Sequence, residues 1–377
     1  VDVNEAIGVI GQTPVGITTY AGDGAIVHPS VLFLPQRWNG WRYWMAYTPF
    51  KNGDSQYENP SIAVSDDGET WTVPAGLTNP VEPDPGGGDY NADPCLCMTA
   101  DGATMLLVWK HAAFTKTTYL RTSTDGVTWT AKVALFANAF EDASPALLWD
   151  GTQYVMWTVK HADTPNTLYR RTAPAPVGPW SAPVACTVTL PAGFELWHID
   201  IKKSGQQYHA LVATLDVVGA FGNRLFFGKS NDGMVWTFGA DQTIQTMANN
   251  QSQFYKGCIL PKVTPDGLAF DCWFTARGNY ALMKTTITFD RTARRRAADA
   301  GGDVDLPLEH GGPLELPRPD GPHRLLLRAC RADASEHPRR AVRGRRSVVL
   351  LPLLGSSARV DRRHEPRADC AVSSDSG

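Results

Sequence analysis

The feature that most constrains this chain is a short motif that recurs along it at nearly even spacing. The pattern Ser-x-Asp-Gly-x-x-Trp ends at Trp71, Trp129 and Trp236, and the variant "APAPVGPW" ends at Trp180 in the remaining slot. An Asp-Gly pair between strand-like runs is a strong signal for a β-hairpin. Four short strands per unit, repeated every ~50 residues, are typical of β-propeller blades.

Each repeat contains the same series of strand-like segments. Inner strands are expected at 29–34, 94–99, 145–149, 199–203 and 258–264, and second strands at 43–48, 104–110, 153–160, 208–214 and 268–276. A third strand leads into the Asp-Gly turn, and the fourth strand carries the tryptophan, which we expect to pack against the neighbouring unit. The turn aspartates Asp67, Asp125 and Asp232 are expected to be structural, because Asp hydrogen-bonds its own turn.

These elements predict an all-β protein, a five-bladed β-propeller of four-stranded antiparallel blades over residues 25–290. The fifth unit has no clear fourth strand, so the N-terminal segment 1–24 is a candidate to complete it and close the ring. After Arg291 the composition changes, and no Trp, Tyr, Phe, Lys, Ile, Met, Asn or Gln occurs again. Residues 291–377 are therefore interpreted as a disordered low-complexity tail or, as we favour, as out-of-frame translation of GC-rich DNA.

Several classes of function receive no support from the composition. The formal net charge is -3, and no aromatic residue is interleaved with the arginines of the tail, so no nucleic-acid partner is expected. The absence of an eighteen-residue apolar run argues against membrane insertion. The seven cysteines have no CxxC spacing, and Cys95 and Cys97 are expected on one strand face in the core. No metal site is predicted from these cysteines.

Strand direction places many polar residues on one face of the propeller. In a meander, the starts of first strands, the ends of second strands and the starts of third strands share that face. The Lys-His pair of "VWKHA" recurs in "TVKHA" of the next blade. Individually such residues are commonly solvated, but their convergence on one axial mouth favours binding or catalysis. The residues so placed are His28, Glu58, Asn59, Asp93, His111, Asp142, His161, Trp197, His198, Tyr255 and Lys256.

Blades that open with Asp-Pro or x-Pro, combined with these hairpins, resemble the five-bladed propeller glycosidases of family 43 and their invertase-like relatives. "YWMAYTPF" and "YENPSIAVSDDGETW" are also similar to propeller modules of phage tail and secreted bacterial proteins. The resemblance implies three carboxylates at the starts of the first three inner strands, serving as base or nucleophile, pKa modulator and general acid. The first position falls on His28, the second on Asp93 in "ADP", and the third near Asp142 or Ala143.

Histidine at the first position leaves three interpretations open. Glu58 supplies the missing carboxylate, or His28 itself is the base, or the site has lost hydrolysis and only binds sugar, with Trp41 and Trp197 as stacking platforms. The resemblance also implies that His198 could approach an axial ion, for which Ca²⁺ is the candidate, although no cofactor is required. A six-bladed sialidase is disfavoured, since its aspartate box has different spacing.

The leading hypothesis is a glycosidase-like enzyme that hydrolyses a polysaccharide and is extracellular or virion-associated. Its rival is a non-catalytic glycan-binding module of the phage-tail or secreted-adhesin type. The expected partner is an oligo- or polysaccharide. The predicted catalytic residues are Asp93, Glu58, Asp142 and His28, and the predicted substrate-binding residues are Trp41, Asn59, His111, His161, Trp197, His198, Tyr255 and Lys256.

Overall fold

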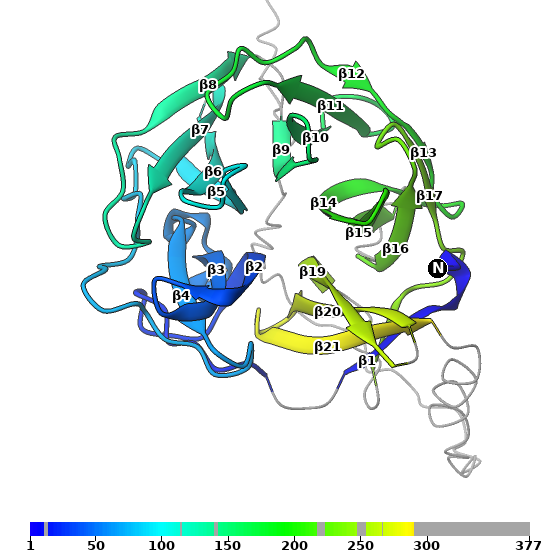
Figure 1. Ribbon diagram of the computed structural model, residues 1–377, viewed down its shortest axis with the longest axis horizontal. Helices are drawn as coiled ribbons and strands as arrows, with labels where there is room; N and C mark the ends of the chain where they lie inside the picture. Colours follow the sequence, from blue (N-terminus) through cyan, green and yellow to red (C-terminus); the bar gives the residue numbers. More distant parts are fainter. Residues whose placement is uncertain are drawn as a thin grey trace, which may run out of the picture. The chain divides into compact units, whose positions relative to one another are not determined.

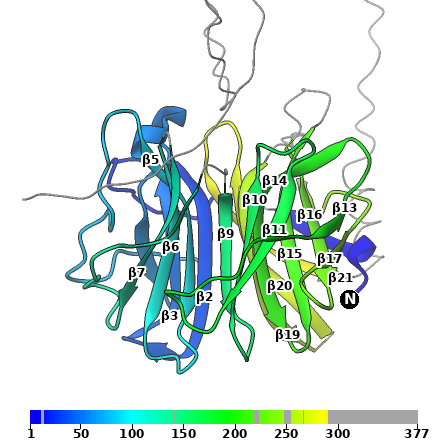
Figure 2. The same ribbon diagram turned by 90° about the horizontal axis from the view of Figure 1, so that it is seen from above.

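The computed structural model describes residues 1–10, 14–113, 115–138, 142–216, 223–246, 254–265 and 267–289. Within this part, five β-sheets stand around a common centre (Figure 1). Figure 2 shows the same strands from the side, where they run along the axis of the ring. The predicted all-β, five-bladed propeller is confirmed. The tail after Arg291 lies outside the described residues.

Each blade is an antiparallel meander whose first strand is innermost. Blade 1 consists of β2 (Ile26–Trp38), β3 (Trp41–Pro49) and β4 (Ser61–Ser65), and an isolated bridge between Val64 and Thr72 stands in place of a fourth strand. Blade 2 consists of β5 (Tyr90–Met98), β6 (Met105–Ala112), β7 (Lys116–Ser123) and β8 (Val133–Asn138). Blade 3 consists of β9 (Asp142–Trp149), β10 (Tyr154–Lys160), β11 (Thr167–Ala173) and β12 (Val184–Ala185).

The last two blades carry additional strands at their outer edges. Blade 4 consists of β14 (Phe194–Ser204), β15 (Gln207–Asp216), β16 (Leu225–Ser230) and β17 (Val235–Phe238), with β13 (Thr187–Thr189) parallel to β17. Blade 5 consists of β19 (Phe254–Thr264), β20 (Gly267–Ala276) and β21 (Leu282–Phe289). β1 (Ala6–Ile10) pairs with β21, and β18 (Ile244–Thr246) pairs with β1. The 3-10 turns are η1 (Val3–Glu5), η2 (Lys51–Gly53) and η3 (Ser55–Tyr57).

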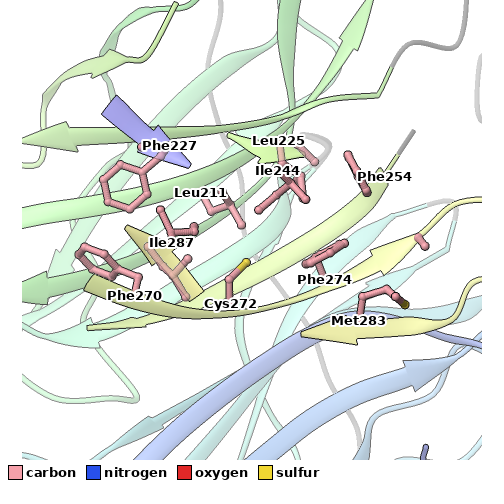
Figure 3. Close-up of a cluster of buried hydrophobic side chains, with 14 of the residues drawn as sticks. Leu211, Leu225, Phe227, Ile244, Phe254, Phe270, Cys272, Phe274, Met283 and Ile287 are labelled. Atoms are coloured by element: carbon pink, nitrogen blue, oxygen red, sulfur yellow. The ribbon is translucent and has the colours of Figure 1, made fainter. Parts of the chain in front are cut away.

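The hydrophobic core lies between the blades rather than inside any one of them. The second strands are almost continuously apolar, because neighbouring blades cover both of their faces; β6 is buried along nearly its whole length. Figure 3 shows one such layer, in which Leu211 and Phe227 of blade 4 face Phe270, Phe274 and Ile287 of blade 5. A blade therefore cannot bury its apolar faces alone, which is why the repeat specifies a closed ring.

The motif tryptophans pack against the preceding blade, as the sequence predicts. The rings of Trp71 and Trp273 have centroids 6.2 Å apart, and those of Trp236 and Trp157 are 6.1 Å apart. The prediction that each fourth strand carries the tryptophan is wrong in blades 2 and 3. There Trp129 and Trp180 precede β8 and β12, because the chain leaves the ladder at the tryptophan to place the ring against the preceding blade.

The turn aspartates are structural. In the turn of blade 2, the Oδ1 atom of Asp125 accepts hydrogen bonds from the Val127 and Thr128 amides and from the Ser123 hydroxyl. The backbone hydrogen bonds lower the pKa of Asp125 to about 2. Asp67 makes the same contacts in blade 1, and its pKa is also lowered to about 2. None of the helices in the described part of the chain is long and apolar enough to cross a membrane.

Candidate functional site at the propeller axis

Every inner strand contains a β-bulge at the same height. The pairing register shifts at Val27/Ser30 in blade 1, Ala92/Cys95 in blade 2 and Leu196/His198 in blade 4, and corresponding shifts occur in blades 3 and 5. The first three bulges contain His28, Asp93 and Ser144, whose φ angles are 56°, 55° and 52°.

Each of these residues precedes a proline, which has no amide N–H to contribute to the ladder. A bulge at this point leaves the ladder without an unpaired donor and turns the preceding side chain in a new direction. The inner strands consequently begin several residues earlier than predicted, and the x-Pro pairs lie inside them rather than in front of them.

The bulge residues of the five blades meet in one buried cluster with Asp93 at its centre. The Oδ1 atom of Asp93 is 3.3 Å from His28 Nε2, 3.1 Å from His198 Nδ1 and 3.4 Å from Lys256 Nζ. The same oxygen accepts a hydrogen bond from the hydroxyl of Ser144 at 3.2 Å. All five side chains are buried, the most accessible being His198 at 4%. Residues from four other repeats therefore contact the single carboxylate of Asp93.

A second layer of polar groups surrounds the two histidines. The Nδ1 atom of His28 lies 3.0 Å from Thr48 Oγ1, with which it hydrogen-bonds, and 3.4 Å from Glu58 Oε2. Glu58 is itself buried and precedes β4, where the chain leaves η3. The Nδ1 atom of His198 lies 2.7 Å from Ser144 Oγ. The His28 imidazole thus stands between the carboxylates of Glu58 and Asp93.

Aromatic rings form one wall of the cluster. The Tyr255 ring lies 5.2 Å from that of His28 and is stacked on that of His198 at 5.4 Å. Trp197 lies 4.3 Å from His198 and 4.6 Å from Tyr255. Trp197 and Tyr255 are both only half-buried, whereas His28 and His198 are buried, so these two rings form the part of the cluster that reaches solvent.

Burial and charge set the protonation states in the cluster. Burial lowers the pKa of His28 well below its ordinary value and that of His198 to about 4, so both imidazoles are neutral at pH 7. Burial alone would raise the pKa of Asp93. Interactions with His28, His198 and Lys256 outweigh that effect, and the Asp93 pKa lies well below its usual range. The cluster therefore contains an ionised carboxylate and two neutral imidazoles, with Lys256 beside the carboxylate.

His28, Asp93 and His198 are also arranged as metal ligands would be. Each can offer one ligand atom, and the three atoms lie within 4.8 Å of one another. His28 Nε2, Asp93 Oδ2 and His198 Nε2 are buried and have no hydrogen-bond partner among the described residues. Two imidazoles and one carboxylate with an open position match the ligand set of catalytic zinc sites, whereas Ca²⁺ takes oxygen ligands. The donor set therefore fits Zn²⁺ better than the Ca²⁺ expected from the resemblance.

Comparison with known proteins agrees with this fold. No protein-family model matches the chain. Over 113 residues, which are 28% of this chain and 15% of the relative, the sequence is 42% identical to the A type blood N-acetyl-alpha-D-galactosamine deacetylase of Flavonifractor plautii. The match thus spans a small part of that relative's length.

Two solved structures extend the likeness over most of the propeller. An N-acetylgalactosamine deacetylase from F. plautii, solved in complex with blood group B trisaccharide, has a TM-score of 0.65 at 20% identity, covering 79% of this chain and 99% of that one. The catalytic domain of the Coprinopsis cinerea family 62 α-L-arabinofuranosidase has a TM-score of 0.53 at 14% identity, covering 75% and 96%. This chain therefore shares the fold of these two proteins. The resemblance inferred from the sequence is confirmed at the level of fold.

Most of the residues predicted for the site lie together. His28, Glu58, Asp93, His198, Tyr255 and Lys256 form the cluster with Trp197 at its edge, and His161 Nε2 lies 2.8 Å from the Trp197 carbonyl oxygen. Asn59 and His111 lie one step further out, where both hydrogen-bond to Asn91, two residues before Asp93.

One predicted residue, Trp41, does not join the cluster, and for another, Asp142, only the backbone is described. Trp41 lies at the start of β3 and pairs with Trp38 at the end of blade 1 opposite the cluster. A second strand starts at that opposite face and ends at the face that carries the cluster. Trp41 packs against the Trp44 cluster, so a stacking role in this site is wrong on geometric grounds. The backbone of Asp142 pairs with Lys160, and its side chain lies outside the described part.

Ser144 is the residue that the sequence reasoning missed. It occupies in blade 3 the position that His28 and Asp93 hold in blades 1 and 2, including the left-handed φ and the proline that follows. The resemblance implies a carboxylate at the third position, near Asp142 or Ala143, one or two residues before Ser144. The Ser-Pro pair of "ASPALLW" was the available signal.

Proposed function

We propose that this protein is a hydrolase that removes the N-acetyl group from an N-acetylated sugar. The observation that carries the proposal is the set His28, Asp93 and Ser144 at the three positions where the glycosidase resemblance implies three carboxylates. With His198, this set offers a cation site beside a single central carboxylate. The 42% identity to a stretch of a deacetylase supports the same chemistry.

The position of His28 argues against cleavage of a glycosidic bond. Glycosidases need two carboxyl groups on either side of the bond, separated by ~5–9.5 Å so that sugar and water fit between them. Here an imidazole ring stands between Glu58 and Asp93, 3.4 Å from one carboxylate and 3.3 Å from the other. Amide hydrolysis needs instead a group that polarises a carbonyl, a base for water and a proton for the leaving nitrogen.

The residues around the cluster can divide these tasks. A water oxygen adds to the acetyl carbonyl carbon, the carbon–nitrogen bond breaks, and the products are acetate and the free amine of the sugar. We assign Glu58 as the base that takes the proton of the water, because its buried carboxylate lies 3.4 Å from the imidazole of His28, a residue of the proposed cation site. The proton then passes to the leaving nitrogen. The Lys256 ammonium favours negative charge that develops beside Asp93.

His28, Asp93 and His198 would hold a divalent cation, for which Zn²⁺ is the proposed candidate. When bound, such an ion polarises the carbonyl and lowers the pKa of water. Trp197 and Tyr255 provide the apolar wall against which a sugar ring would lie. The half-buried indole of Trp197 places that wall at the solvent side of the cluster.

The test is acetate release by the purified full chain with added Zn²⁺, measured on N-acetylgalactosamine- and N-acetylglucosamine-terminated oligosaccharides, the blood group A trisaccharide among them. Nitrophenyl glycosides are assayed in parallel for glycosidic cleavage. Asp93→Asn is the control, because Asn tolerates the left-handed φ of this position while losing the charge. We expect acetate release that Asp93→Asn abolishes.

Two results would contradict the proposal. Glycoside cleavage without acetate release would return the assignment to a glycosidase. Glycan binding without any turnover would favour the non-catalytic binding module.

A further inference from the structure

The hydroxyl of Ser144 lies within the cluster, between Asp93 and His198. It is completely buried, its residue has a φ of 52°, and Pro145 follows it. Ser144 Oγ is 2.7 Å from His198 Nδ1 and 3.2 Å from Asp93 Oδ1, so one hydroxyl connects the imidazole of blade 4 to the carboxylate of blade 2. A serine that only filled space would not require a left-handed backbone, which is strained for any residue with a side chain.

The surroundings decide which atom carries the proton in each of these hydrogen bonds. The hydroxyl of Ser144 donates its single proton to Asp93 Oδ1, and the same carboxylate oxygen lies 3.1 Å from His198 Nδ1. An unprotonated Nδ1 would direct its lone pair at that carboxylate oxygen. The imidazole therefore carries its proton on Nδ1 and donates to Ser144, whose own hydroxyl proton is then directed to Asp93.

We propose that Ser144 is a positioning residue that holds His198 in the tautomer protonated on Nδ1. This tautomer leaves the lone pair of Nε2 available, and Nε2 is buried and has no hydrogen-bond partner among the described residues. A histidine that binds a cation through one nitrogen is commonly held in this way through the other. The inference depends on the proposed function in one respect: the cation that Nε2 would bind.

The geometry excludes the alternative that Ser144 is a nucleophile activated by His198. In a Ser-His-Asp triad, the serine and the aspartate bind opposite nitrogens of the imidazole. Here Ser144 and Asp93 both approach Nδ1, so no base with a free lone pair faces the hydroxyl. Ser144 has no exposed surface at which a substrate carbonyl could reach its oxygen.

Two substitutions of Ser144 distinguish the effect of the hydroxyl from the effect of the backbone conformation. Ser144→Gly removes the hydroxyl and suits the positive φ, so it adds no backbone strain. Ser144→Asn also tolerates the left-handed region and restores an oxygen acceptor. Thermal unfolding of each variant verifies that the propeller is intact.

The tautomer is read from ¹⁵N–¹H correlation spectra of the full chain with ¹⁵N-labelled histidine. The chain has nine histidines, and the His198 signals are those missing in His198→Gln. We expect a protonated Nδ1 in the wild type, a mixture of tautomers in Ser144→Gly, and recovery in Ser144→Asn. Asp93 cannot hold the tautomer alone, because His28 and Lys256 share its Oδ1 atom.

The affinity for Zn²⁺ alone, measured by competition with a chelator, should fall about 10–100-fold in Ser144→Gly. A wild-type His198 protonated on Nε2 would overturn the inference, as would a Ser144→Gly variant with unchanged tautomer and Zn²⁺ affinity. Neither measurement uses a substrate. Failure of the deacetylase assay therefore leaves this result intact, and the reverse also holds.

Discussion

At the scale of single residues, the site depends on three side chains held in a backbone conformation that they rarely adopt. His28, Asp93 and Ser144 all have φ near 55°, and strain of this kind costs about 1–3 kcal/mol per residue. Small polar residues tolerate this region better than β-branched ones do. The ring maintains the strain at three successive blades because these bulges direct polar side chains onto the axis, where they meet.

The assignment of Glu58 as base gives a prediction that separates chemistry from cation binding. Glu58→Gln keeps the shape of the side chain but cannot accept a proton. We expect kcat for acetate release to fall about 10²–10⁴-fold, the usual range for loss of a general base. Zn²⁺ affinity, measured by chelator competition, should change little, because Thr48 still hydrogen-bonds His28 Nδ1.

His28→Gln is the matched control, since it removes a proposed ligand and should weaken Zn²⁺ binding and activity together. If Glu58→Gln lost Zn²⁺ affinity to the same degree as His28→Gln, Glu58 would be a positioning group for His28. The assignment of the base would then be wrong.

The sequence predicted much of this cluster but not its centre. The positions of His28 and Asp93 follow from the x-Pro repeat, and those of Glu58, His198 and Lys256 from strand direction. The Oδ1 atom of Asp93 contacts four other residues. This central role depends on distances across five blades, which no local sequence pattern encodes. Trp41 was misplaced because its aromatic character was given more weight than its position at the start of a second strand.

At the scale of elements, the Asp-Gly turn of one blade interlocks with a tryptophan of the preceding blade. Trp273 Nε1 donates to the Gly68 carbonyl at 2.9 Å, and Trp157 Nε1 donates to the Gly233 carbonyl at 2.7 Å. In blade 2, a Cβ added at Gly126 would overlap the Trp44 ring of blade 1. The glycine of the motif is thus required for two reasons, its positive φ and the indole lying against it.

This interlock predicts that Gly126→Ala is more destabilising than an alanine at another turn glycine. Gly102→Ala is the matched control, because Gly102 has a φ of 69° but no atom within 4 Å of an added Cβ. The control should lose about 1–2 kcal/mol of unfolding free energy from backbone strain alone. Gly126→Ala should lose about 1–3 kcal/mol more through displacement of Trp44. Denaturant unfolding measures both, and equal losses would show that the indole contact contributes nothing.

The sequence predicts which segments form strands more reliably than it predicts where those strands begin and end. The predicted inner strands of the first three blades begin at Pro29, Pro94 and Pro145, where proline lacks the amide N–H that a ladder needs. The bulge removes that restriction, and β5 begins at Tyr90, well before Pro94. The fourth strand of blade 1 is only a bridge at Thr72, a difference that the shared motif does not reveal.

At the scale of the whole propeller, the ring is closed by strands far apart in the sequence. β1 lies beside β21 in antiparallel pairing and beside β18 in parallel pairing (Figure 1). Val3 and Ala6 add to the core between blades 4 and 5. The number of blades could be predicted from the repeat, since each unit is local. The position of β1 between two strands depends on non-local pairing, for which the sequence offers only a suitable apolar segment.

Closure of the ring can be tested by a single substitution in β1. A Cβ at Gly8 would lie 2.9 Å from the Thr285 side chain and 3.2 Å from that of Ile244, so Gly8→Val should push β1 away from both neighbours. Gly16→Val is the matched control, because nothing lies within 4 Å of a Cβ there and its φ is not in the left-handed region. Overpacking of this kind costs about 1–3 kcal/mol.

We expect Gly8→Val to lower the Tm by several degrees relative to Gly16→Val, since a domain of 150–250 residues shifts by about 2–4 °C for each kcal/mol. The amides of blade 5 should also exchange hydrogen faster, because β21 loses the strand that covers its outer edge. Hydrogen exchange localises the effect, and scanning calorimetry measures its size. An unchanged Tm with unchanged exchange in β21 would mean that the ring holds together through the interfaces between blades, without the contribution of β1.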